Sequence, residues 1–276
     1  MKIFKDYKYL FILLGGLFLF LFGSVFGLIM AYVICGDGMG MESFSKIISY
    51  FANYYSDTIL ENGQVASVFV QEYFANNPND LEIAKYANIL IQFFAYIPLL
   101  VFFGIFLVKD FISDGKEFGK DTKNNFVNIL KWFGILYGAS YAIAIVYQIL
   151  GIDGQSDNES LLTLMMDCDA KLLFLIAIVI IGPFVEEVLY RKLIFDTVEK
   201  TFKFKPIVAI IISVLVFSVI HVSDAENIKY VFQYIAMAIP ITLSYHFSKN
   251  NFWVSYGVHV CNNLLVAIGY LLMFGI

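Results

Sequence analysis

Seven long apolar segments constrain the fold of this chain more than any other feature. They cover residues 9–34, 88–108, 128–150, 172–198, 207–222, 229–247 and 252–274. A bilayer core of ~30 Å takes about 20 helical residues, and most of the segments reach that length. The chain is 60% hydrophobic and 15% charged, more apolar and less charged than a soluble domain. The predicted fold class is therefore all-α, a polytopic transmembrane helix bundle of about seven spanning helices.

The distribution of lysines predicts an orientation. Lysines gather at residues 2–8, 109–123 and 200–205, whereas the intervening loops at 35–87 and 151–170 are acidic. Because cytoplasmic loops carry the excess of Lys and Arg, we expect a cytoplasmic N-terminus and an extracytoplasmic C-terminus. The abundance of Phe, Ile, Tyr, Lys and Asn favours a bacterial plasma membrane. The sequence has no basic patch, so we expect the lipid bilayer as a partner and no nucleic acid.

The first loop, residues 35–87, is long for a helix bundle. The stretches FSKIISYFANYY and VASVFVQEYFANN have apolar residues at helical spacing, and NNPND interrupts the second. Two amphipathic helices at the membrane interface are predicted. They could pack against the bundle or form a lid over a site, and packing is the favoured interpretation.

The apolar segments contain ionisable residues away from the predicted helix ends, among them Glu186, Glu187, Arg191, His221 and His259. An unpaired charge costs at least ~2.5–3.5 kcal/mol at the centre of a membrane helix, so such residues are functional candidates. Glu187 and Arg191 are four residues apart and can pair on one helix face. Glu186 is rotated by about 100° from that face and has no such partner.

Helix lengths predict that the remaining polar residues converge. Glu186 and His221 lie about 21 and 22 Å from the same membrane side on neighbouring antiparallel helices, at 1.5 Å per residue. His259 and Asn263 share a helix face, whereas Asn262 is expected to point elsewhere. Pro183 is expected to loosen and bend the helix just before Glu186.

Two kinds of chemistry fit this set of residues. A Glu and a His can activate water as a general base, while a second His and an Asn stabilise a tetrahedral oxyanion. Alternatively, Glu186, His221 and His259 could bind Zn²⁺ or another divalent metal that activates the water. The zinc-protease pattern HExxH is absent, and the residues alone leave both alternatives open.

Three ordered motifs resemble the CPBP family of intramembrane proteases, also called the Abi or type II CAAX prenyl endopeptidase family. They are EExxxR in PFVEEVLYR, FxxxH in FSVIH and HxxxN in HVCNN. The resemblance covers about residues 170–270. It implies a catalytic transmembrane core at 166–276, preceded by transmembrane helices at 1–165 that carry the 35–87 loop.

The resemblance also implies residue roles. Glu186 would be the water-activating base assisted by His221, His259 and Asn263 would form the oxyanion site, and Glu187 and Arg191 would stabilise the site. Both metal-dependent and metal-independent glutamate mechanisms have been described for the family, and the second is favoured here, so no cofactor is expected.

The expected function is intramembrane endopeptidase cleavage of a membrane-associated peptide or protein. One alternative is a non-catalytic scaffold or bacteriocin-immunity-type membrane protein of the same fold. The other is a proton-coupled transporter, against which the absence of two related halves counts.

Overall fold

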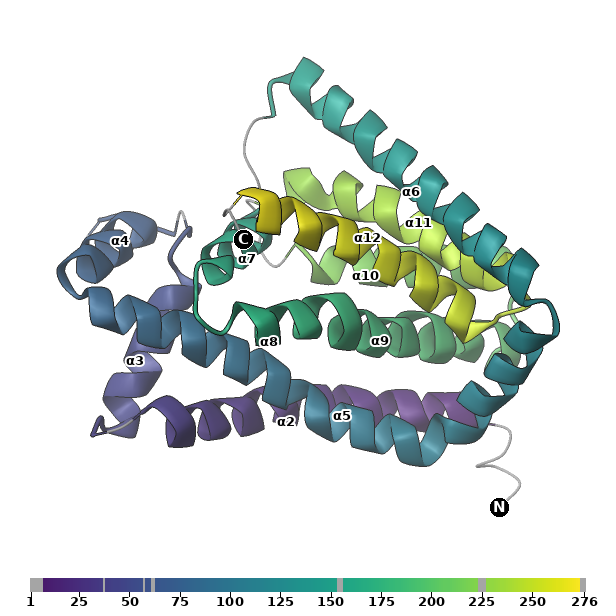
Figure 1. The fold of residues 1–276 in the computed structure, drawn as a ribbon, viewed down its shortest axis with the longest axis horizontal. Helices are drawn as coiled ribbons and strands as arrows, with labels where there is room; N and C mark the ends of the chain where they lie inside the picture. The colour runs from purple at the N-terminus through teal and green to yellow at the C-terminus, as the bar shows by residue number, and fades with distance from the viewer. Residues whose placement is uncertain are drawn as a thin grey trace.

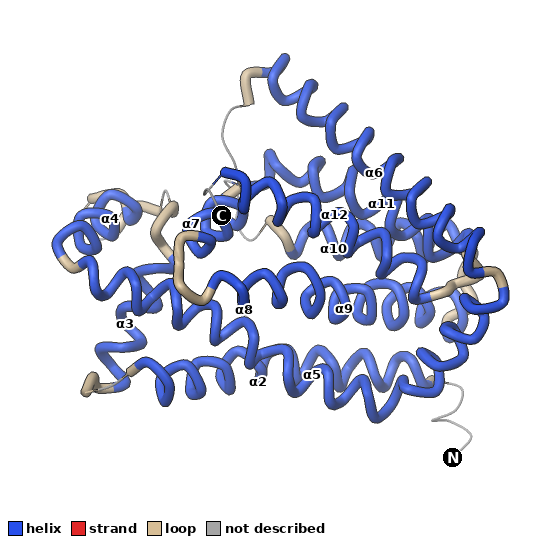
Figure 2. Tube along the Cα trace, viewed as in Figure 1, coloured by secondary structure: helices blue, strands red, loops and turns tan. Residues whose placement is uncertain are grey.

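The computed structural model describes residues 7–36, 38–56, 58–60, 63–152, 156–222 and 227–273. Regular structure within these ranges is helical, apart from one isolated β-bridge between Ile59 and Val65 (Figure 2). The helices are α2 (Lys8–Cys35), α3 (Met41–Ala52), α4 (Ala66–Asn76), α5 (Pro78–Lys120), α6 (Thr122–Leu150), α7 (Asp157–Met166), α8 (Lys171–Ile176), η1 (Ala177–Ile181), α9 (Gly182–Glu187), η2 (Val188–Phe195), η3 (Thr197–Thr201), α10 (Pro206–Ile220), η4 (Asn227–Tyr230), α11 (Val231–Phe247) and α12 (Phe252–Met273).

All seven predicted apolar segments are helical, which confirms the all-α polytopic bundle. Five helical stretches among the described residues are long and apolar enough to cross a membrane. These are α2, α5, α6, the stretch Lys171–Thr201 from α8 to η3, and α12. The other two segments, α10 with 15 residues and α11 with 17, are shorter than a typical span. The predicted number of about seven spans therefore stays a prediction.

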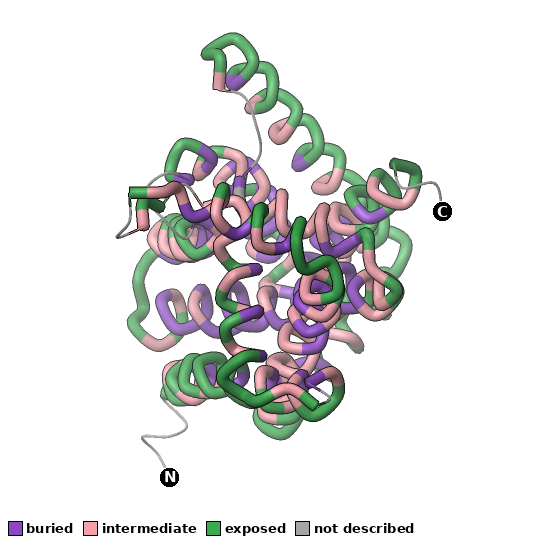
Figure 3. Tube along the Cα trace, turned by 90° about the vertical axis from the view of Figure 1, so that its left-hand side faces the viewer, coloured by how far each residue is buried: buried purple, intermediate pink, exposed green. Residues whose placement is uncertain are grey.

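The stretch from α8 to η3 is the central element of the bundle. Half of its most apolar window is buried inside the protein, against 11–22% for the other candidate spans. Figure 1 shows α2 and α5 side by side along one face of α8 and α9, with α10, α11 and α12 on the opposite face and α6 outermost. Buried positions accordingly concentrate inside the bundle, while α6 is largely exposed (Figure 3). The acidic motif is thus carried by the helix best shielded from lipid.

Close packing of α2 on α5 depends on two glycines. A Cβ atom on Gly23 would lie 2.5 Å from the Ala95 carbonyl oxygen, and one on Gly27 would overlap the Ile91 carbonyl. The spacing is the small-xxx-small pattern that allows membrane helices to approach backbone to backbone. These glycines therefore fix the position of α5 against the bundle.

The first loop forms the two predicted helices, α3 and α4. Their apolar faces, which include Phe51 and Phe74, pack with Ala84 of α5 and Phe174 of α8 in one hydrophobic cluster. This arrangement agrees with the packing interpretation rather than the lid. Their location at a membrane interface stays a prediction.

Asp114 of α5 joins three elements at the opposite end of the bundle. Its Oδ2 atom lies 2.6 Å from Nζ of Lys192 on η2 and accepts the Phe252 backbone N–H at the start of α12. The Asn251 side chain also donates to the Asp114 backbone carbonyl, at 2.8 Å. Asp114 therefore sets α12 relative to the central helix.

Candidate active site

Glu187 and Arg191 form the predicted ion pair. Arg191 Nη1 lies 3.0 Å from Glu187 Oε1, and both side chains are completely buried. The Arg191 guanidinium also stacks 4.9 Å from the ring centre of Phe217 on α10. Because each buried charge has its partner within the same helix, the pair can exist inside the bundle without unpaired charge.

Glu186 points away from this pair and into a cavity, as its rotation on the helix predicts. Its Oε2 atom lies 3.8 Å from Nε2 of His221 and 3.8 Å from Nε2 of His259. The Glu186 side chain is 24% exposed, whereas Glu187 is fully buried. Two imidazoles from different helices thus face one carboxylate oxygen, and all three side chains line the same cavity.

A hydrogen bond at Nδ1 orients each of the two imidazole rings. His221 Nδ1 lies 2.7 Å from the Phe217 carbonyl oxygen, and His259 Nδ1 lies 2.9 Å from Glu187 Oε1. Carbonyl and carboxylate oxygens only accept, so both Nδ1 atoms carry hydrogen. In the neutral imidazoles, the Nε2 atoms that face Glu186 are therefore the free acceptors.

The π-helical turn η1 explains how Asn263 is held. There the Gly182 N–H bonds back to the Ala177 carbonyl, and the next residue, Pro183, has no N–H to donate. The Ile178 carbonyl accepts the Asn263 side-chain amide instead, at 2.8 Å. The predicted loosening before Glu186 thus takes the form of a π-helical turn that anchors α12.

Asn262 also faces the site, so the prediction that it points elsewhere is wrong. Its amide donates to Asn263 Oδ1 at 3.1 Å and approaches the Met237 sulfur at 3.4 Å. Neighbouring helix residues differ by only about 100°, and the cavity is wide enough for both to line it. It encloses about 250 Å³.

The cavity brings Glu186, His221, His259 and Asn263 together. Its remaining lining residues are Gln92, Tyr96, Glu159, Leu162, Ile178, Gly182, Tyr234, Met237, Asn262, Val266 and Tyr270. Sequence motifs missed the contributions of α5 and α7, namely Gln92, Tyr96 and Glu159. The only available signal was Gln92, a polar residue inside a predicted span.

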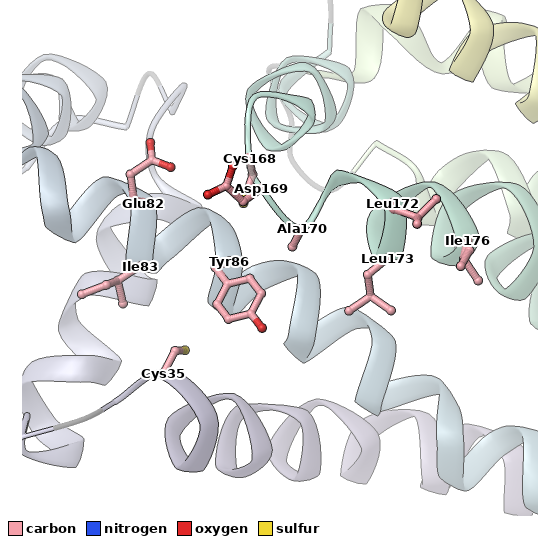
Figure 4. Close-up of a pocket in the computed structure, with 10 residues that line it drawn as sticks. All are labelled: Cys35, Glu82, Ile83, Tyr86, Cys168, Asp169, Ala170, Leu172, Leu173 and Ile176. Atoms are coloured by element: carbon pink, nitrogen blue, oxygen red, sulfur yellow. The ribbon is translucent and has the colours of Figure 1, made fainter. Parts of the chain in front are cut away.

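A larger cavity, of about 740 Å³, lies elsewhere between the end of α2, the start of α5 and the connection to α8 (Figure 4). Its polar lining consists of Cys35, Glu82, Tyr86, Cys168 and Asp169. Glu82 is paired with Lys85 at 2.9 Å, and the cavity contains no histidine. Its chemistry does not match the predicted reaction, so we place the candidate site in the smaller cavity.

Glu186, His221 and His259 are the residues of the cavity that could bind a metal ion. No group of three or more His, Cys, Asp or Glu side chains within the described ranges is arranged to hold a metal ion. The two Nε2 atoms do converge on Glu186, and their Nδ1 atoms have the hydrogen-bonded partners typical of histidine ligands. The donor set therefore has suitable chemistry, while its present spacing is not that of a coordination sphere.

Residues 169–265 match the family model for the type II CAAX prenyl endopeptidase Rce1-like proteins. This part of the chain is similar to that family. The Rce1-like region spans the central helix to α12 and contains all six residues predicted from the motifs. The residues of α5 and α7 that line the cavity lie outside the Rce1-like region.

Individual relatives are bacterial. The chain is 30% identical to YdiL of Bacillus subtilis (strain 168), provisionally named a membrane peptidase, over 51% of this chain and 54% of the relative. It is 28% identical to the membrane-embedded CAAX protease MroQ of Staphylococcus aureus (strain USA300), over 70% of this chain and 81% of the relative. An uncharacterized Mycoplasma capricolum protein is 26% identical over 70% of this chain and 58% of that protein.

The alignments therefore span little more than half of the Bacillus and Mycoplasma relatives. No solved structure matches the chain. Together with the apolar helices, the Rce1-like match identifies a multi-pass membrane protein similar to membrane peptidases.

Proposed function

We propose that this protein is an intramembrane endopeptidase that cleaves a membrane-associated peptide or protein. The observation that carries the proposal is the position of Glu186 Oε2, 3.8 Å from Nε2 of both His221 and His259 within the bundle. Similarity to MroQ and YdiL supports the same reaction class.

In the proposed reaction, water binds between Glu186 and His221. Glu186 takes a proton from this water, and its oxygen attacks the carbonyl carbon of the scissile peptide bond. The tetrahedral intermediate then collapses, the C–N bond breaks, and the proton passes to the leaving amine. His221 orients the water through the Nε2 acceptor that its bond to Phe217 leaves free.

His259 and Asn263 are proposed to stabilise the oxyanion. One Asn263 amide hydrogen is engaged by Ile178, which leaves the second for the substrate. His259 can donate from Nε2 only as an imidazolium, because Nδ1 already bonds Glu187. Glu187 Oε1, 2.9 Å from Nδ1, holds the His259 ring so that Nε2 faces the cavity, where an imidazolium would donate to the oxyanion.

We propose that the reaction needs no metal. The residues that would hold Zn²⁺ or another divalent ion are Glu186, His221 and His259, and the ion would supply an activated water. The described side chains do not form a ready coordination group. Insensitivity to chelators is therefore the expected result.

The topology and division of the chain are part of the same proposal. We place the N-terminus in the cytoplasm and the C-terminus outside a bacterial plasma membrane, with residues 166–276 as the catalytic core. Residues 1–165 then frame the core. Reporter fusions at each terminus test the orientation.

Purified protein assayed against a fluorogenic peptide library tests the function. Wild type should cleave, whereas Glu186→Gln and His221→Asn should lose at least about 10²-fold in kcat, as expected when a general base is removed. His246→Asn is the matched control, because His246 lies at the end of α11 outside the cavity. Equal cleavage by wild type and Glu186→Gln would reject the proposed role of Glu186. A folded wild type that cleaves nothing in the library would favour a scaffold or immunity function.

The same assay with a chelator separates the two mechanisms. Unchanged cleavage supports the metal-independent route. Activity that is lost with the chelator and restored by Zn²⁺ would assign the water activation to a metal.

A further inference from the structure

Tyr96 and Gln92 of α5 bring to the cavity two polar side chains that the motifs do not include. Both lie outside the Rce1-like region and line the cavity opposite α12. They are four residues apart, so they share a helix face, and the Gln92 side chain lies beside the Tyr96 hydroxyl.

Gln92 does not accept the Tyr96 hydroxyl hydrogen. Its Oε1 atom is buried and has no hydrogen-bond partner, so the Tyr96 hydroxyl does not donate to it. A tyrosine hydroxyl has a single hydrogen. Because Gln92 does not accept this hydrogen and Tyr96 lines the cavity, the hydrogen can be donated into the cavity.

Gly182 shows where the Tyr96 hydroxyl points. The site that a Cβ atom would occupy on Gly182 lies 3.5 Å from the Tyr96 hydroxyl oxygen and 4.0 Å from Glu186 Oε1. The Ala177 carbonyl oxygen lies 3.1 Å from the same site, so the site itself is closely packed, and Gly182, Tyr96 and Glu186 all line the cavity. The hydroxyl and the predicted base therefore flank the same space.

The predicted oxyanion site is short of donors, which gives the hydroxyl a role. Asn263 retains one free amide hydrogen, and His259 donates only when it is protonated. Oxyanion holes generally use at least two donors aimed at the developing charge. Gln92 Oε1, a buried acceptor without a partner, would be satisfied by an N–H of a bound peptide.

We propose that Tyr96 is a catalytic residue that donates its hydroxyl hydrogen to the carbonyl oxygen of the scissile peptide bond. Gln92 is then a positioning residue that holds this hydroxyl and accepts a substrate N–H. This inference rests on the proposed endopeptidase function. It assigns part of the active site to the chain outside the Rce1-like region.

Tyr96→Phe tests the proposal, because it removes the hydroxyl and keeps the ring. Assayed with the best peptide found in the library, it should lower kcat by about 10- to 10³-fold, as for loss of an oxyanion donor, with little change in KM. Tyr86→Phe is the matched control on the same helix, since Tyr86 lines the other cavity. Thermal unfolding in detergent checks that all variants are folded.

The pH profile of kcat separates a direct role from an indirect one. If Tyr96 acts on the substrate, Tyr96→Phe lowers kcat at all pH values and leaves the acidic limb in place. A shifted acidic limb would mean that Tyr96 acts through Glu186, and wild-type kcat in Tyr96→Phe would mean that it does not act. Either result overturns the proposal.

Gln92→Met tests the positioning role of Gln92, because it retains the side-chain volume and removes the amide. It should lower kcat by a smaller factor than Tyr96→Phe, and the double variant should be no worse than Tyr96→Phe for kcat. Fully multiplicative effects on kcat would contradict the positioning role. Glu186→Gln assayed in parallel keeps the outcomes apart: an inactive Glu186→Gln with an active Tyr96→Phe rejects this inference alone.

Discussion

His259 Nδ1 lies 2.9 Å from Glu187 Oε1, so the buried ion pair also orients a residue of the candidate site. Arg191 Nη1 lies 3.0 Å from the same oxygen. One carboxylate therefore links the central helix to α12. A hydrogen bond thus joins the EExxxR motif to the HxxxN motif. Glu187 orients His259, whereas Glu186 faces the cavity.

Glu187→Gln should lower both stability and activity. It leaves Arg191 as an uncompensated buried charge, which costs about 3–5 kcal/mol of unfolding free energy. The combined Glu187→Leu, Arg191→Met variant should regain much of the stability, because buried pairs can often be replaced by apolar side chains. It should stay inactive, because His259 has lost its Nδ1 partner.

Denaturant unfolding in detergent and peptide cleavage measure the two effects. A stable and fully active double variant would show that Glu187 does not orient His259.

Asp114→Asn should destabilise the protein although Asp114 lies outside the candidate site. The substitution leaves the buried Lys192 ammonium without its carboxylate at 2.6 Å and weakens the contact to the Phe252 N–H. We expect a loss of about 2–4 kcal/mol, near the range for breaking a buried ion pair. Glu117→Gln is the control, because its pair with Lys120 is exposed to solvent and should contribute little to stability. Equal unfolding midpoints for the two variants would contradict this prediction.

Gly27→Ala should separate α2 from α5. The added methyl group would overlap the Ile91 carbonyl oxygen, a backbone atom that cannot move without shifting the helix. We expect a loss of about 1–3 kcal/mol, typical of overpacking. Gly104→Ala, on α5, is the control because nothing lies within 4 Å of its Cβ site, and it should be neutral or slightly stabilising. Thermal unfolding of both variants in the same detergent measures these effects. An unchanged melting temperature for Gly27→Ala would contradict the close packing of α2 on α5.

Glu159 should make stability depend on pH. Burial raises the pKa of its carboxyl above the ordinary value of 4.5, so the folded state binds the proton more tightly than the unfolded state. Stability from this group is fully present below pH 4.5 and is lost as pH rises through the raised pKa. Glu159→Gln should remove this dependence while it keeps the helix cap, because the Glu159 backbone N–H still bonds Ser156 Oγ and Gln also serves in a capping box.

The difference in melting temperature between wild type and Glu159→Gln, measured from pH 4.5 to 8, tests this. It should favour wild type increasingly toward low pH. Glu72→Gln, at an exposed position on α4, is the control for the Glu-to-Gln substitution itself. A flat curve for Glu159→Gln would mean that the carboxyl is not buried in solution.

The helices and the pairing of residues within one helix follow from the amino-acid sequence. Apolar runs and the scarcity of charge specify membrane helices because lipid satisfies no backbone polar group. The four-residue spacing of Glu187 and Arg191 predicts their contact, since residues at that spacing are neighbours on a helix. Glu186 and His221 are predicted to lie at similar depth in the membrane, because the helix rise per residue is constant. This similar depth predicts that they approach one another.

Packing between segments far apart in the chain sets which side chains complete the cavity. Tyr96, Gln92 and Glu159 reach it because α5 and α7 pack beside α8 and α9, and no local pattern encodes that contact. Asn262 joins Asn263 at the wall because the cavity is wider than one helix face. Helical spacing fixes the direction of a side chain on its own helix. The partner that it meets depends on packing between segments far apart in the chain, as for His259 and Glu187.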